Sequence, residues 1–175
     1  MRISILIVIV YMTFNIFYPP EESTKVKITM TGLIGSSAEN SPIPPCFLPS
    51  SLGSHINTIL ECNKVINAGL YPERAYYNRG LAYLKLGKYD LALSDCLISI
   101  ELSPKDARGY YNCGVSHYEL GEYEQALEEF TTTTELAPNW MMGYYQRATT
   151  FVELGQWKNA EDDNLYAWYL NRQHY

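Results

Sequence analysis

The sequence predicts an all-α fold, a right-handed α-solenoid of antiparallel helix pairs with about seven helices. The main observation is an internal repeat, because residues 73–106 align without gaps with residues 107–140 and then with the stretch from 141 onward. A fixed period of this length is typical of stacked helix pairs. The helix-ending residues also recur in phase, namely Gly87, Gly121 and Gly155 inside the units and Pro104 and Pro138 at their ends.

Each unit has the pattern of two helices joined by a short turn. In the first unit, Tyr76, Gly80 and Tyr83 recur at helical spacing, and a glycine follows that can adopt the left-handed conformation of a helix end. We expect the second helix over residues 89–102, because Pro104 prevents its continuation. One helix pair cannot bury both of its faces, so neighbouring units are expected to stack.

This pattern resembles the tetratricopeptide repeat family, in which aromatic, Gly, Tyr, Ala, Phe, Ala and Pro residues recur at fixed offsets. The resemblance covers roughly residues 57–172, and it is weakest in the third unit, where Ala148, Asn164 and Arg172 depart from the pattern. In the second unit, His117 takes the place of the tyrosine. The matching residues are Tyr76, Gly80, Tyr83, Ala92 and Pro104, then Tyr110, Gly114, Ala126, Phe130 and Pro138, then Tyr144, Phe151, Ala160 and Ala167.

The first part of the chain differs from the repeats. Arg2 precedes an uncharged run, residues 3–18, which is close to the length of a membrane span and slightly longer than a signal-peptide core. We interpret it as a signal anchor or an uncleaved signal, so the protein is expected to be membrane-anchored through residues 3–18 or exported, the alternative being cytoplasmic. The predicted division is 1–20 hydrophobic segment, 21–52 flexible linker, 53–72 leading half-repeat, and repeats 73–106, 107–140 and 141–175.

Composition and motifs argue against several classes of function. The net charge of -6 is unfavourable for a nucleic-acid surface, which needs clustered Lys and Arg. The three histidines, His55, His117 and His174, are isolated in sequence, and no Gly-rich phosphate loop occurs. We therefore expect neither catalysis nor a cofactor, and we assign no catalytic residue.

The cysteines allow one weak metal hypothesis. Cys113 and His117 lie four residues apart on one helix, and Cys96 lies on the preceding helix, so a zinc-dependent enzyme is the least favoured hypothesis. The favoured interpretation is that these cysteines pack as small apolar side chains and that no metal is bound. Disulfides are also not expected, because Cys62 and Cys96 lie a full repeat apart on successive second helices.

Two charge pairs are predicted inside the repeats. Arg79 and Asp95 in the first unit are 16 residues apart, as are Arg147 and Asp163 in the third. The middle unit lacks the arginine and also lacks the aspartate at the matching position. We expect an ion pair with a structural role between the two helices of each of these units.

The family resemblance implies that a peptide or protein partner lies in the concave groove formed by the first helices. We therefore predict a non-catalytic scaffold that binds a peptide or protein. The alternative is a self-associating structural subunit, a homo-oligomer formed through the aromatic C-terminal helix. The predicted groove residues, which include a tyrosine ladder and no strong carboxylate clamp, are Arg74, Tyr77, Asn78, Leu81, Arg108, Tyr111, Asn112, Val115, Tyr118, Tyr145, Gln146 and Thr149.

Overall fold

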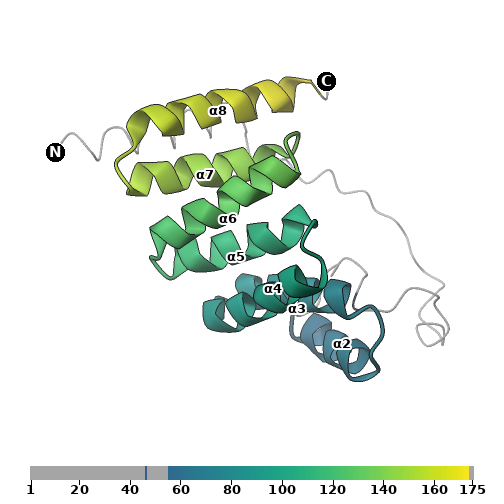
Figure 1. Ribbon diagram of the computed structural model, residues 1–175. Coiled ribbons are helices and arrows are strands. Elements are labelled where there is room, and N and C mark those ends of the chain that lie inside the picture. Colours follow the sequence, from purple (N-terminus) through teal and green to yellow (C-terminus); the bar gives the residue numbers. More distant parts are fainter. Residues whose placement is uncertain (1–45, 47–54, 174–175) are drawn as a thin grey trace, which may run out of the picture. The chain divides into compact units, whose positions relative to one another are not determined.

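The computed structural model describes Cys46 and residues 55–173 (Figure 1). The predicted hydrophobic segment and nearly all of the predicted linker lie outside these residues. Within the described part, the chain forms seven helices and no strand. None of these helices has the length and apolar character needed to span a membrane.

The seven helices stack in chain order, which confirms the predicted all-α solenoid of antiparallel helix pairs (Figure 1). Three complete pairs, α3 with α4, α5 with α6 and α7 with α8, follow the single helix α2. The bounds are α2 His55–Asn67, α3 Pro72–Lys85, α4 Tyr89–Leu102, α5 Ala107–Glu119, α6 Tyr123–Leu136, α7 Met141–Glu153 and α8 Trp157–Arg172.

The repeated glycines end the first helix of every pair. Gly87, Gly121 and Gly155 adopt φ values of 68°, 80° and 72°, a conformation that costs a residue with a side chain more than it costs glycine. The backbone N–H that follows Gly87, that of Lys88, donates to the carbonyl oxygen of Tyr83 at 2.9 Å. This bond occupies a carbonyl that the helix end leaves without an intrahelical donor, so the turn is short and the second helix folds back on the first.

Small residues bring the helices close together, and one large side chain fills the centre. Phe130 of α6 is fully buried against Gly114 of α5. A β-carbon added at Gly114 would lie 2.6 Å from the ring of Phe130, so this position requires glycine in the middle repeat. The equivalent residue of the third repeat, Ala148, is buried without such a ring beside it.

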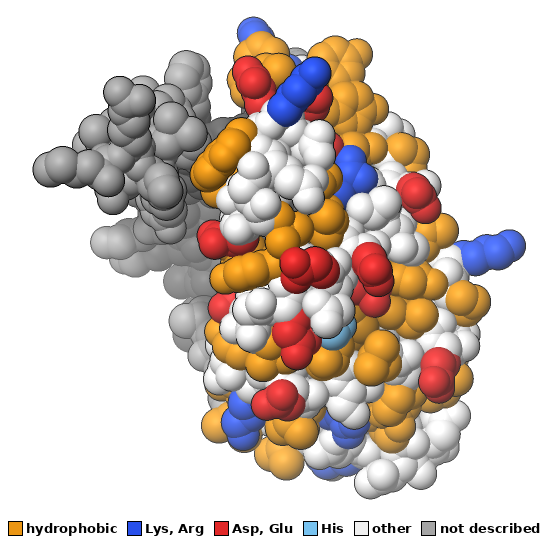
Figure 2. Space-filling model, turned by 60° about the vertical axis from the view of Figure 1, so that its left-hand side comes forward, with side chains coloured by type: hydrophobic (Ala, Val, Ile, Leu, Met, Phe, Trp, Pro, Cys, Tyr) orange, Lys and Arg blue, Asp and Glu red, His pale blue; other side chains and the backbone are white. Residues whose placement is uncertain are grey.

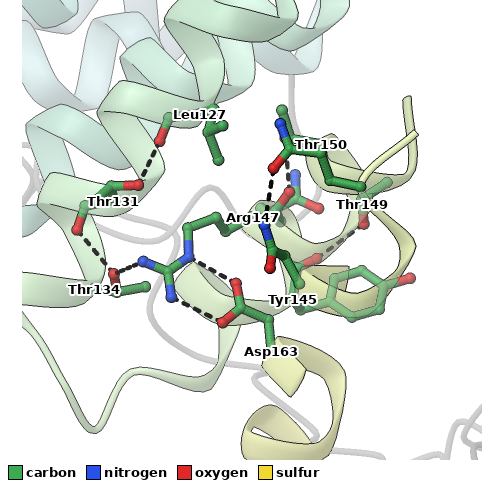
Figure 3. Close-up of polar contacts among 11 residues, drawn as sticks. Leu127, Thr131, Thr134, Tyr145, Arg147, Thr149, Thr150 and Asp163 are labelled. Carbon is green, nitrogen blue, oxygen red and sulfur yellow. Dashed lines mark hydrogen bonds and ion pairs between the residues drawn. The ribbon is translucent and has the colours of Figure 1, made fainter. Parts of the chain in front are cut away.

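The predicted ion pairs are confirmed. Arg79 of α3 donates to both carboxylate oxygens of Asp95 on α4 at 2.8 and 2.7 Å. Arg147 of α7 binds Asp163 of α8 in the same way at 2.6 and 2.8 Å (Figure 3). Such bidentate pairs are stronger and more directional than single hydrogen bonds.

Each of these arginines also reaches back to the preceding helix. Arg79 donates to the side-chain oxygen of Asn63 on α2 at 2.5 Å, and Arg147 donates to the hydroxyl oxygen of Thr134 on α6 at 2.8 Å. Figure 3 shows Arg147 between Thr134 on one side and Asp163 on the other. One side chain therefore joins the two helices of its own repeat to the repeat before it.

The expectation that disulfides would be absent is wrong. Cys96 of α4 is bonded to Cys113 of α5, with Cα atoms 5.5 Å apart, and Cys46 is bonded to Cys62 of α2, with Cα atoms 4.8 Å apart. The prediction compared Cys62 with Cys96, which occupy equivalent positions on successive second helices. The bonded partner of Cys96 lies instead on the next first helix, which packs directly against α4.

Candidate protein-binding surface

The predicted groove residues lie on three helices that neighbour one another. The first helices contact each other in the order α3, α5, α7, in addition to their contacts with the second helices. Arg74 and Arg108 are exposed at the start of α3 and α5. The half-buried residues of the predicted set are Tyr77, Asn78, Leu81, Tyr111, Val115, Tyr118, Tyr145, Gln146 and Thr149.

Asn112 does not belong to an open surface, which corrects the prediction for this residue. It is only 1% exposed, and its side-chain amide donates to the backbone carbonyl oxygen of Tyr77 at 3.4 Å. Asn112 therefore joins α5 to α3 and directs one of its amide N–H donors into the protein. A buried amide needs such a partner, because desolvation without a hydrogen bond is costly.

The junction between the first and second repeats carries charge. The guanidinium group of Arg108 lies 5.0 Å from the centre of the Tyr77 ring, within the range of a cation–π contact. Arg108 also binds both oxygens of Asp106, at 2.9 and 2.6 Å, and these hydrogen bonds lower the pKa of the Asp106 carboxyl. Burial raises the pKa of the Tyr77 hydroxyl above its ordinary value.

The junction between the second and third repeats is apolar instead. The ring of Tyr111 lies 4.7 Å from that of Trp140 and 5.9 Å from that of Phe130, measured between ring centres. Trp140 occupies the repeat position that Asp106 holds one unit earlier. Aromatic pairs at these distances contribute to stability beyond the area that they bury. Here they also place the half-buried rings of Tyr111 and Trp140 beside the start of α7.

A hollow of about 720 Å³ lies where these two junctions meet. It is formed by the turn between α4 and α5 and by the turn between α6 and α7. One side offers the cations of Lys105 and Arg108, and the other offers the Trp140 indole with aliphatic neighbours. The lining residues are Ser103, Pro104, Lys105, Asp106, Ala107, Arg108, Leu136, Ala137 and Trp140.

Of the predicted set, only Arg108 lines this hollow, because the prediction considered helix positions and not the turns between units. Lys105, Asp106 and Trp140 were missed. The signal that could have found them is the replacement of Asp106 by Trp140 at equivalent positions of two well-matched repeats.

Further along α5, Tyr118 connects the first helices to each other. Its hydroxyl donates to the carboxylate of Glu153 at the end of α7 at 3.4 Å, and its ring lies 5.4 Å from that of Tyr123. Burial, together with the negative charge of Glu153, raises the pKa of Tyr118 to about 12. On α7, the hydroxyl of Thr149 donates to the carbonyl of Tyr145 (Figure 3).

The residues of the weak zinc hypothesis are engaged in other contacts. Cys96 and Cys113 share a disulfide, so neither provides the thiolate that zinc binding needs. His117 lies 2.6 Å from the carboxylate of Glu122, so its ring has a hydrogen-bond partner within the protein. Among residues 46 and 55–173, no group of three or more His, Cys, Asp or Glu side chains is placed to hold a metal ion.

Comparison with protein families assigns the repeats. Residues 73–106 and residues 107–140 each match a model of the tetratricopeptide repeat. The chain is a tetratricopeptide repeat protein, built on a helical scaffold of the class that mediates protein interactions. No match was found among curated protein sequences.

Solved structures with the same fold include several MamA proteins. "MamA RS-1 ArsTM double mutant" is 24% identical, with a TM-score of 0.65, and the match covers 70% of this chain and 69% of that one. "MamA 41-end from Desulfovibrio magneticus RS-1" is 23% identical, with a TM-score of 0.63 and coverage of 68% and 67%. "MamA MSR-1 C2" is 21% identical, with a TM-score of 0.59 and coverage of 69% and 70%. At this identity the likeness concerns the fold alone.

Proposed function

We propose that this protein is a non-catalytic scaffold that binds a segment of a protein partner along α3, α5 and α7. The observation that carries the proposal is the hollow between the α4–α5 and α6–α7 turns, where Trp140 and Arg108 line one cavity. Beside this hollow, the first helices carry half-buried tyrosines at the equivalent positions 77, 111 and 145. Aromatic and arginine side chains of this kind are enriched where protein partners bind most tightly.

The chemistry of the hollow favours one kind of segment. An aromatic or aliphatic side chain would pack on Trp140 and Leu136, since these present apolar surface to the cavity. Lys105 and Arg108 carry two positive charges against the one negative charge of Asp106, so an adjacent carboxylate on the partner would be favoured. The matching position of the third repeat is Met142, which provides no cation, and the repeated carboxylate clamp of some relatives is not expected.

We further propose that the scaffold works outside the reducing cytosol, held at a membrane or exported through residues 1–18. The two disulfides support this proposal, because structural disulfides persist in oxidising compartments and are rare in the cytosol. The test is fractionation of the full-length chain against one that begins at Ala38. That start keeps Cys46 and so preserves its disulfide with Cys62. Equal amounts of both chains in the soluble fraction would contradict membrane anchorage.

The binding surface can be tested with a library of immobilised synthetic peptides. We expect the Trp140→Ala and Arg108→Ala variants to bind the retained peptides about tenfold more weakly or worse, because each removes one side of the hollow. Glu124→Ala on α6 is the matched control, since Glu124 is exposed and lies on a second helix. Equal weakening by the control, or unchanged binding by both hollow variants, would place the binding surface elsewhere.

A further inference from the structure

Helix α8 carries an exposed aromatic face at the end of the described stack. It buries Ala160, Asp163, Ala167 and Leu170 toward the rest of the protein. On the opposite side of the helix, Leu165, Trp168 and Tyr169 remain 60%, 51% and 52% exposed. Figure 2 shows hydrophobic side chains gathered at the top of the molecule, where α8 lies in Figure 1. Contiguous exposed apolar surface of this kind typically marks a site of association.

The charges on this face are arranged with opposite signs at its two ends. Glu161 and Asp162 lie before the aromatic residues, and Arg172 follows them with its guanidinium 4.8 Å from the centre of the Trp168 ring. Asp162 and Arg172 are ten residues apart on one helix, which is about 15 Å at 1.5 Å per residue. They cannot pair with each other within one copy of the chain.

We propose that this face binds the α8 helix of a second copy of the chain, in an antiparallel arrangement centred at the level of Ala167. In this register, Leu165 lies opposite Tyr169, and Tyr166 lies opposite Trp168. Asp162 of each copy then meets Arg172 of the other. Because a two-fold contact uses the same patch on both copies, the ion pair forms twice. The aromatic side chains of the two helices then cover one another in the space between the two ion pairs.

The charge pattern favours a second copy of α8 as the partner and favours the antiparallel orientation. A parallel pairing of two α8 helices would set Asp162 against Asp162 and Arg172 against Arg172, which is unfavourable at both ends. In the antiparallel pairing, both ends are attractive. The inference concerns a surface at the end of the stack and is independent of the hollow beside Trp140, so either proposal can fail without the other.

The test is a charge swap read out as the mass of the full-length protein in solution, by analytical ultracentrifugation over a concentration series. The wild-type chain is expected to dimerise. Asp162→Arg and Arg172→Glu, each measured alone, are expected to weaken the dimer about tenfold or more, because each puts like charges together at both ends. An equimolar mixture of the two variants is expected to recover the dimer, since every facing pair then has opposite signs.

The control is Lys158→Glu, a charge reversal on the same exposed side of α8 that lies outside the residues paired in this register. It is expected to leave the dimer unchanged. Circular dichroism confirms that each variant keeps its helical content, so a lost dimer is not a lost fold. A monomeric wild-type chain, dimers that resist both single variants, or a mixture that stays monomeric would each overturn the proposal. Dimers lost equally with Lys158→Glu would also overturn it.

Discussion

The first and middle repeats have the same fold but are tied to their neighbours by different chemistry. In the first repeat, Arg79 joins Asp95 of its own pair and Asn63 of the preceding helix by hydrogen bonds. In the middle repeat, the same position is Cys113, and its bond to Cys96 of the preceding helix is covalent. The third repeat returns to the first scheme through Arg147. One repeat position therefore joins successive units in all three cases.

The difference shows that the repeat pattern determines where the helices lie but not which chemical bond joins one repeat to the next. The pattern of glycines, alanines and aromatics places the helices. The residue that bridges to the preceding second helix differs between repeats, being Arg79, Cys113 and Arg147 in turn. The middle repeat gives up the ion pair within its own pair of helices, because Cys113 cannot bind a carboxylate as arginine does. The middle repeat has Glu129 at the position equivalent to Asp95, but Cys113 stands where the paired arginine would be.

The largest effect is expected from breaking the first repeat's ion pair. Arg79→Leu leaves the Asp95 carboxylate, 4% exposed, without its guanidinium partner, and should lower the free energy of unfolding by about 3–5 kcal/mol. The double variant Arg79→Leu with Asp95→Leu should be milder than Arg79→Leu alone, since no buried charge remains. Urea unfolding of Arg79→Leu, of Asp95→Leu and of the double variant measures this. Simply additive losses would contradict the coupling.

Removing the covalent tie of the middle repeat should have the next largest effect. Replacing Cys96 and Cys113 by Ala opens a loop with a sequence separation of 17, and should cost about 3 kcal/mol if the bond restricts the unfolded chain. A reducing agent should lower the melting temperature of the wild-type protein. A variant lacking all four cysteines should be insensitive to the same agent, and a wild-type melting temperature unaffected by reduction would contradict the account.

The close contact in the middle repeat gives a smaller effect. Gly114→Ala forces a methyl group against the buried Phe130 ring and should destabilise the protein by about 1–3 kcal/mol. Gly80→Ala is the matched control, because the nearest atom there is the β-carbon of Asp95 at 3.3 Å. We expect the control to cost less in a thermal melt. The reverse order would mean that Phe130 moves more freely than its complete burial indicates.

The smallest effect concerns pH. Burial raises the pKa of Glu129 above its ordinary value of 4.5, although the nearby His117 acts in the opposite direction. The folded state therefore binds more protons than the unfolded state in this range, and this group's contribution to stability falls as the pH rises from 4.5 through the raised value. Glu129→Gln should remove that part of the pH dependence. Identical stability-versus-pH profiles for both proteins would contradict the assignment.

The sequence was sufficient for the fold and for the ion pairs, because both follow from residues that recur at a fixed spacing. Arg79 with Asp95 and Arg147 with Asp163 share one separation, so the pairs could be predicted without coordinates. The disulfides could not be found in the same way. Cys96 bonds across a repeat boundary to Cys113 on the next helix. A comparison of equivalent repeat positions, such as Cys62 and Cys96, does not consider such a pair.

The candidate site was predicted only in part for a similar reason. Tyr77, Tyr111 and Arg108 follow from helix positions and lie beside the hollow or its junctions. Asn112 was misplaced, because periodicity does not reveal that its amide turns inward to the carbonyl of Tyr77. Trp140 lies in a turn, where helical periodicity gives no information on which way a side chain points.

The most direct test of the proposed scaffold function is site-specific photo-cross-linking in cells that produce the full-length protein. A photoreactive residue at Val115, half-buried on α5, is compared with one at Gln125, exposed on α6. We predict that a partner protein is cross-linked from position 115 and not from position 125, and that Trp140→Ala abolishes the product. A product formed equally from both positions, or one insensitive to Trp140→Ala, would contradict binding along the first helices.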